Sequence, residues 1–282
     1  MSEDQYFITG DGCRIAYRLD GEAGRPVLAL SNSIATDLHM WDRSVPALRE
    51  SFQLLRYDTR GHGGSDAPMG PYSLDRLGRD VIELLDHLGM DRVYFLGLSL
   101  GGFVGQWLGI YAPNRIIRLV LSNTSPFLAG ELPFDELIHN VLATQTMDEV
   151  ADGFVRNWFP ESWFSQPNDV VNEFRSMVLT TPRQGLAGCY AALRDVDLRR
   201  PISLITSPTL VIGGESDAVT KPEHSQEIAS AIPDAELILL PGVHILNVEQ
   251  ADLFHQAVER FLSNNAGVGE LPQQKEHELL RS

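Results

Sequence analysis

The sequence contains little cysteine. Its 282 residues include only Cys13 and Cys189, which lie far apart and without the spacing of a metal site. The pattern therefore indicates neither a disulfide framework nor a zinc site, and we expect no metal. Free cysteines suit a reducing compartment, so the cytoplasm is the expected location.

Long hydrophobic runs are also missing. No stretch approaches the roughly 18 consecutive apolar residues that a membrane span needs. The first residues, MSEDQYFITGDG, lack the basic segment followed by an apolar one that begins a secretory signal. We expect a soluble, unprocessed protein with no membrane partner.

Positive charge is scarce. Lysine and arginine number 22 against 38 aspartates and glutamates, which gives a formal net charge of -16 at pH 7. No cluster of basic residues is present that could follow a phosphate backbone, so we expect no nucleic-acid partner. The composition leaves the oligomeric state open.

Short apolar runs bounded by turn residues are what the sequence does contain. They do not alternate with polar residues, which is typical of strands buried on both faces in a parallel sheet. Between them apolar residues repeat every three to four positions, as in SLDRLGRDVIELLDHLG from Ser73, which predicts helices. Strand and helix alternate, so we predict an α/β architecture with a mostly parallel central sheet flanked by helices. The runs are VLAL from Val27, QLLRYD from Gln53, VYFLG from Val93, RLVLSN from Arg118, TLVIGG from Thr209 and ELILLP from Glu236.

The alternation breaks in one long segment, where the sequence is helical and aromatic (NWFPESWF) and offers no strand. We expect this segment, residues 124–200, to form a helical cap inserted into a core made of residues 1–123 and 201–263. The polar tail, residues 264–282, is expected to be flexible.

One serine is enclosed by glycines. The pentapeptide GLSLG, Gly97 to Gly101, follows an apolar run and precedes a helical pattern. G-x-S-x-G between a strand and a helix is the nucleophile-elbow pattern, in which larger residues at the glycine positions would collide with neighbouring backbone. We therefore predict Ser99 as the nucleophile. The amides of Leu100, at the helix start, and of Ser33, in the loop after VLAL, are the predicted oxyanion donors.

A serine hydroxyl needs a base, which in this arrangement follows an acid along the chain. Of the eight histidines, His244 lies in the loop directly after the last apolar run, and we predict it as the general base. Asp217, in the loop after TLVIGG, is predicted as the acid that orients the base, with Glu215 as the local competitor. The corresponding loop one strand earlier holds Ser-Asn-Thr, residues 122–124, and no carboxylate.

Several of these segments resemble the 3-oxoadipate enol-lactonase group of the α/β-hydrolases. They are SNSIATDLHMW, LRYDTRGHGGSD, GPYSLDRLGRDVIELLDHLG, GLSLGGFVGQWLG and NVEQ after the histidine, and the similarity runs from about residue 6 to residue 262. The resemblance implies an α/β-hydrolase fold with a helical cap, a small-molecule lactone or ester substrate, and hydrolysis without a cofactor. Its most specific implication is 3-oxoadipate enol-lactone hydrolysis in aromatic catabolism. The family triad falls on Ser99, Asp217 and His244, and the family oxyanion donors fall on Ser33 and Leu100.

Two positions depart from the family pattern. Phe127 stands where a basic residue is common, and Leu246 replaces a common serine after the histidine, so the cap side of the site is more apolar. A cation for a substrate carboxylate would then have to come from elsewhere in the cap. The candidates are Arg156, Arg175, Arg183 and Arg194, and the expected pocket residues are Ile34, Trp41, Phe127, Trp158 and Leu246.

Other functions stay open on this reasoning. A carboxylesterase that acts on more apolar, neutral esters would use the same residues, with perhydrolysis as a side reaction. A ligand receptor could keep the triad and use the pocket for binding and for recruiting a partner. Slow single turnover with a persistent adduct would favour the receptor.

Overall fold

An eight-stranded sheet forms the centre of the protein, in the order β1-β2-β4-β3-β5-β6-β7-β8. The computed structural model describes residues 4–263, and the predicted C-terminal tail lies outside them. The strands from β4 to β8 in this order pair in parallel, whereas β1 and β2 form an antiparallel hairpin on one edge. The strands are β1 Gln5–Ile8, β2 Arg14–Asp20, β3 Val27–Ser31, β4 Gln53–Tyr57, β5 Val93–Leu98, β6 Ile116–Ser122, β7 Thr209–Gly214 and β8 Glu236–Leu240.

The mostly parallel α/β sheet predicted from the sequence is confirmed. All six predicted apolar runs lie in strands, and every residue of β7 is buried, which is why that run carries no polar alternation. The hairpin β1–β2 was not predicted. It lies at the sheet edge, where three of the four β1 residues are exposed, so its sequence offers no apolar run.

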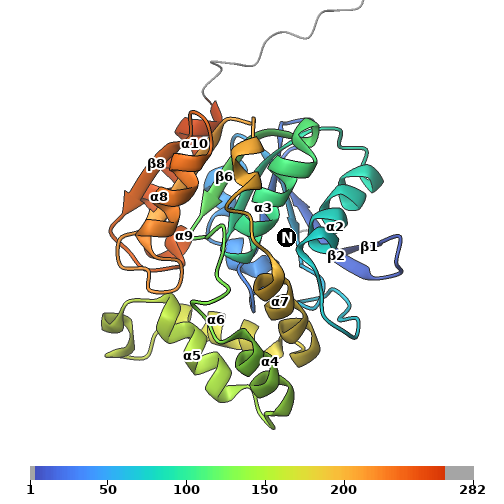
Figure 1. Cartoon of the computed structure of the whole chain (residues 1–282). Coiled ribbons are helices and arrows are strands. Elements are labelled where there is room, and N and C mark those ends of the chain that lie inside the picture. The colour runs from blue at the N-terminus through green and yellow to red at the C-terminus, as the bar shows by residue number, and fades with distance from the viewer. Residues whose placement is uncertain (1–3, 264–282) are drawn as a thin grey trace, which may run out of the picture.

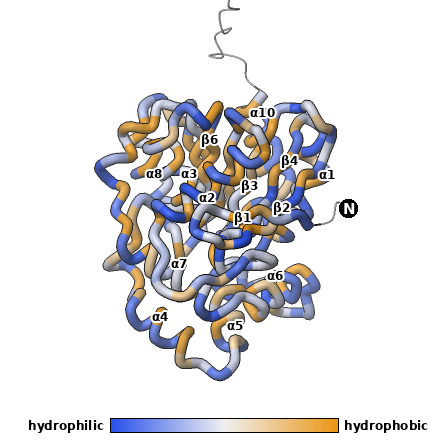
Figure 2. The backbone as a smooth tube through the Cα atoms, turned by 90° about the vertical axis from the view of Figure 1, so that its right-hand side faces the viewer, coloured by the Kyte–Doolittle hydropathy of each residue, from blue (hydrophilic) through white to orange (hydrophobic). Residues whose placement is uncertain are grey.

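Helices pack on the sheet in the places where the sequence shows helical periodicity. In α2, which follows the N-cap Ser73, the apolar residues at spacings of three and four are buried. Within the described residues, none of the helices combines the length and the apolar composition that crossing a membrane would require. Figure 2 shows hydrophobic residues both in the body that holds the sheet and along the helices labelled α4, α5 and α6. The elements around the sheet are η1 Leu38–Trp41, α1 Val45–Leu48, α2 Leu74–His87, α3 Leu100–Tyr111, η2 Pro113–Arg115, η4 Pro201–Leu204, α8 Pro222–Ala231, α9 Leu246–Glu249 and α10 Ala251–Ser263.

Four further α-helices lie between β6 and β7 in the chain. They are α4 Phe134–Ala143, α5 Asp148–Trp158, α6 Asp169–Thr180 and α7 Arg183–Asp195, with the short η3 Glu161–Phe164 among them. In Figure 1 α4, α5 and α6 gather below the sheet and α7 runs back toward it. We propose that these helices form the cap, with the boundaries at residues 124 and 200 expected from the sequence.

Two glycines allow the cap to approach the core closely. Gly61, in the loop after β4, faces Gly185 in α7, and a Cβ added at Gly185 would lie 2.1 Å from the Gly61 carbonyl oxygen. Such a distance is far below van der Waals contact, so the two backbones touch only because neither residue has a side chain. The contact places α7 over the carboxyl end of β4.

The same substitution at two cap glycines should therefore have opposite effects. Gly185→Ala should lower the free energy of unfolding by roughly 2 kcal/mol or more, because the new methyl group overlaps the backbone at Gly61. Gly153→Ala in α5 meets no atom within 4 Å and should raise helix stability by up to about 1 kcal/mol. Chemical denaturation of both variants tests this, and equal effects of the two substitutions would contradict it.

Candidate active site

Ser99 lies on a strained turn between β5 and α3. Its φ of 58° and ψ of −114° are unusual for a residue with a side chain. A Cβ added at Gly97 would lie 2.0 Å from the Gly101 carbonyl oxygen, and one added at Gly101 would lie 2.2 Å from the Ser31 carbonyl oxygen. The glycines on either side of the serine therefore make the turn sterically possible, and Ser99 lines a cavity.

His244 and Asp217 form a buried pair at the same edge of the sheet. Asp217 follows β7 and His244 follows β8, and the Nδ1 atom of His244 lies 2.7 Å from Oδ2 of Asp217. This hydrogen bond places a proton on Nδ1 when the ring is neutral and leaves Nε2 as the basic nitrogen. Because His244 and Ser99 line the same cavity, the structure brings all three predicted triad residues to one site.

The Asp217 carboxylate is buried, and protein groups donate hydrogen bonds to both of its oxygens. Its Oδ1 accepts bonds from the amides of Val219 at 2.9 Å and Thr220 at 3.0 Å. Its Oδ2 also accepts bonds from Thr220 Oγ1 at 2.8 Å and from Asn123 Nδ2 at 2.9 Å. Burial alone raises the pKa of this carboxyl, but the His244 ring and these hydrogen bonds outweigh burial and hold the pKa below its ordinary value. Glu215, the competing acid, is exposed.

The two predicted oxyanion donors differ in their surroundings. Leu100 is the first residue of α3, so its amide is one of those that have no acceptor within the helix. The Ser33 amide instead donates to the sulfur of Met40, 3.2 Å away. A thioether is a weak acceptor, so a substrate oxyanion would compete with it readily. The role of Ser33 as a donor stays a prediction.

The loop that carries Ser33 is held by buried polar residues on both sides. Trp41 donates from Nε1 to Oδ1 of Asn32 at 2.8 Å, and Asn32 Nδ2 donates to the Tyr57 carbonyl at 3.0 Å. The amide of Ala35 donates to Nε2 of His62 at 2.9 Å. Burial lowers the pKa of His62 from 6.5 to about 4, which keeps the ring neutral and able to accept this bond.

Sequence reasoning did not assign a function to His62 or to its neighbour Asp58. The Asp58 carboxylate accepts from the amides of Leu38 and Gly64, each at 2.7 Å, and burial raises its pKa to about 7. Both residues lie in the glycine-rich segment DTRGHGG, which entered the sequence analysis only as part of a segment that carries the family resemblance. The signal available in the sequence was an aspartate directly after an apolar run, followed by a histidine between two glycines.

A cavity of about 590 Å³ opens onto Ser99 and His244. Side chains of α4, α5 and α7 form most of its wall, and most of them are apolar. Two of the predicted pocket residues, Ile34 and Trp158, line this cavity. The polar residues at its outer side are exposed, namely Asn140, Glu149 and Asn157.

The other three predicted pocket residues lie elsewhere, which corrects the expectation for them. Trp41 is fully buried and its indole N–H bonds to Asn32, and Leu246 is fully buried as well. The Phe127 ring lies against the guanidinium group of Arg199, with 3.9 Å from Cζ to the ring centroid. None of the three is among the residues that line the described cavity.

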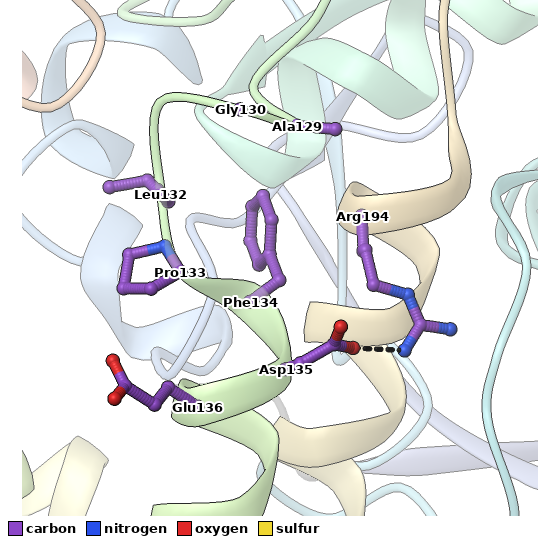
Figure 3. A pocket seen from close by; sticks show the side chains of 8 residues that line it. All are labelled: Ala129, Gly130, Leu132, Pro133, Phe134, Asp135, Glu136 and Arg194. Atoms are coloured by element: carbon purple, nitrogen blue, oxygen red, sulfur yellow. Dashed lines mark hydrogen bonds and ion pairs between the residues drawn. The ribbon is translucent and has the colours of Figure 1, made fainter.

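The candidate arginines of the cap are also directed away from this cavity. Arg175 pairs with Asp148 and Asp152, each at 2.7 Å. Figure 3 shows Arg194 at a neighbouring cavity beside Phe134, with its guanidinium group 2.7 Å from Asp135. Arg156 lies over the Phe164 ring, and Arg183 donates to the Gln145 carbonyl. Among residues 4–263, no lysine or arginine lines the cavity at Ser99.

In the part of the chain that the structure describes, no group of three or more histidine, cysteine, aspartate or glutamate side chains is arranged to hold a metal ion.

Comparison with known proteins gives consistent matches over most of the chain. Residues 26–251 match a family model described as the alpha/beta hydrolase fold. The chain is 35% identical to 3-oxoadipate enol-lactonase 2 of Acinetobacter baylyi, a match that covers 89% of this chain and 94% of that protein. The crystal structure of a hydrolase from Pseudomonas aeruginosa shares 53% identity and superposes with a TM-score of 0.91 over 92% of this chain and 98% of the other. The enol-lactonase of Burkholderia xenovorans shares 37% identity, with a TM-score of 0.88 over 92% of this chain and 100% of the other.

The buried, neutral His62 should make stability depend on pH. Its pKa is about 4 in the folded state and near 6.5 when unfolded, so the unfolded chain binds more protons between these values. The contribution of His62 is therefore fully present above pH 6.5 and is lost as the pH falls toward 4. The stability difference between the native protein and His62→Gln should shrink over this range, by up to about 3 kcal/mol. Denaturation at a series of pH values measures it, and parallel curves for the two proteins would contradict the assignment.

Proposed function

The chain belongs to the α/β-hydrolase family and is an enol-lactonase-like hydrolase, and from this premise we propose that it cleaves a lactone or a carboxylic ester through an acyl-enzyme on Ser99. The family resemblance and the fold expected from the sequence are confirmed by the comparisons. One observation carries the proposal. A strained serine and a histidine bonded to a buried carboxylate line the same cavity.

The proposed reaction uses each of these groups in turn. His244 Nε2 takes the proton from Ser99 Oγ while Oγ attacks the substrate carbonyl carbon, and the amides of Leu100 and Ser33 stabilise the resulting oxyanion. The C–O bond to the leaving group then breaks, and the proton passes from His244 to the departing alkoxide or enolate oxygen. His244 then takes a proton from a water molecule whose oxygen attacks the acyl carbon, the bond from that carbon to Ser99 Oγ breaks, and the proton passes from His244 to Oγ as the acid leaves. Asp217 stays ionised throughout and stabilises the imidazolium.

The first substrate candidate is 3-oxoadipate enol-lactone, as an intermediate of aromatic catabolism. It is supported by the names of the Acinetobacter relatives and by matches along nearly the whole chain. This substrate carries a carboxylate, and an acidic protein repels an anion unless a local cation compensates.

The second candidate is an uncharged ester or lactone with an apolar acyl group. The described cavity at Ser99 has no lysine or arginine in its lining, and the exposed carboxylate of Glu149 lies at its outer side. Leu137, Val141 and Phe154 are among its apolar wall residues. Of the two candidates, the lining favours the uncharged substrate.

The nucleophile is tested by Ser99→Ala. This variant should fold and lose on the order of 10⁴-fold or more in kcat/KM, since only binding and oxyanion stabilisation remain. A serine-directed phosphonate should label the native protein once, within residues 93–103, and leave the variant unlabelled. Near-native turnover by the variant, or labelling at another residue together with loss of activity, would exclude this mechanism.

The charge preference is tested with matched esters. We expect kcat/KM for a neutral adipate diester to exceed that for the corresponding monoester, whose free carboxylate enters a cavity without a cation. Glu149→Gln should raise kcat/KM for the monoester by roughly two- to fivefold at low salt and leave the diester unchanged, because an exposed charge acts weakly. Glu136→Gln is the matched control, since this exposed glutamate lines the neighbouring cavity shown in Figure 3. A preference for the monoester or for 3-oxoadipate enol-lactone would instead establish the first candidate.

A further inference from the structure

The carboxamide of Asn123 contacts both the acid and the loop of the base. Asn123 follows β6, and its Nδ2 lies 2.9 Å from Oδ2 of Asp217 and 3.0 Å from the carbonyl oxygen of Val243. Val243 directly precedes His244, and Asp217 Oδ2 is also the atom that meets His244 Nδ1. The two hydrogens of one NH₂ group are thus shared between the acid side chain and the backbone next to the base.

The local structure holds this carboxamide in one orientation. Ser122 Oγ donates to Asn123 Oδ1 at 2.8 Å, so the oxygen end is occupied and the NH₂ end faces the two acceptors. The Asn123 amide donates to the Ile212 carbonyl at 2.8 Å, which ties the residue to β7. Its φ of 44° lies in the left-handed region, which asparagine, aspartate and glycine adopt more easily than other residues. The side chain is fully buried.

We propose that Asn123 is a positioning residue. Its NH₂ group orients the Asp217 carboxylate and reduces the negative charge on Oδ2, the oxygen that faces His244. This inference rests on the proposed function, because it assumes that His244 acts as the base. The sequence showed that the loop after β6 holds no carboxylate. The structure adds that the asparagine there faces the catalytic acid with a hydrogen-bond donor.

The donor has a definite consequence for proton transfer. By bonding to Oδ2, the Asn123 NH₂ group withdraws negative charge from the atom that faces His244. Removing it leaves a more strongly negative carboxylate oxygen 2.7 Å from the imidazole, which favours the protonated ring over the neutral one. Since the base must be neutral to act, the acidic limb of the kcat/KM profile should move to higher pH.

Two variants separate this effect from a loss of packing. Asn123→Gly tolerates the left-handed backbone and removes the donor, and Asn123→Asp keeps the shape but places a carboxylate oxygen beside Asp217 Oδ2. The acidic limb should move up by roughly half a unit to one unit in Asn123→Gly and by more than about one unit in Asn123→Asp, where two carboxylates share a site. In both variants kcat should fall about three- to tenfold at the plateau with KM nearly unchanged, because the interaction acts on the transition state.

Glu249, another titratable group near the base, needs a control variant of its own. Glu249 in α9 accepts a bond from the Val243 amide at 2.7 Å, and burial raises its pKa, so its titration could also affect the base loop. Glu249→Gln keeps an acceptor and removes the charge, and the shift caused by Asn123→Gly should persist in this background. Asp234→Gly, at an exposed position with φ of 56°, is the control for glycine in a left-handed conformation and should leave the profile unchanged.

The outcomes distinguish this inference from the proposed function. An acidic limb that stays in place in both Asn123 variants, while activity falls at all pH values in step with melting temperature, would reduce Asn123 to a structural residue. The same holds if the shift disappears in the Glu249→Gln background. Retained activity in Ser99→Ala would instead remove the hydrolase mechanism itself. A graded shift, larger for Asn123→Asp than for Asn123→Gly, supports the positioning role.

Discussion

The site depends on keeping one carboxylate ionised in the protein interior. Asp217 is buried, and a charge in such a place is costly unless hydrogen bonds and an opposite charge compensate it. The compensation comes from three neighbouring strand ends: the loop after β7 supplies two amides and a hydroxyl, the loop after β8 supplies His244, and the end of β6 supplies Asn123. Because the strands are parallel, their carboxyl ends lie at one edge of the sheet, and the groups that stabilise the Asp217 carboxylate come together there.

A second framework, separate from the triad, supports the oxyanion loop. Neutral His62, Asp58 and Asn32 each bond to backbone or indole groups around the segment that carries Ser33. Met40 connects this framework to α9, the helix that follows the loop of His244: its sulfur accepts from the Ser33 amide, and its carbonyl accepts from Asn247 Nδ2 at 3.1 Å. Residues some two hundred positions apart therefore share one hydrogen-bonded unit.

The proposed cap supplies most of the wall of the cavity at Ser99. Its helix α5 ends at Trp158, whose carbonyl accepts from the His244 amide at 3.3 Å, so the cap touches the base loop directly. The cap arginines are used in ion pairs with cap aspartates or in contacts with aromatic rings and backbone, which leaves an apolar wall toward Ser99. An acyl group without charge suits such a wall, since an unpaired carboxylate would have to leave water without compensation.

The sequence alone determined the elements that local chemistry controls. Apolar runs without polar alternation predicted six strands, β3 to β8, and the glycines around Ser99 predicted a turn in which larger residues at their positions would clash. Chain order predicted Asp217 and His244, because parallel strands place successive loops at one edge, and the two side chains lie within hydrogen-bond distance of each other. Only the tertiary structure decided how side chains from distant segments face one another. In the folded protein the cap arginines do not line the cavity at Ser99, and the Phe127 ring lies against Arg199. Trp41 and Leu246 are buried, and the side-chain amide of Asn123 donates to Asp217. These outcomes depend on packing and on competition among hydrogen-bond partners across the fold, which spacing along the chain does not encode.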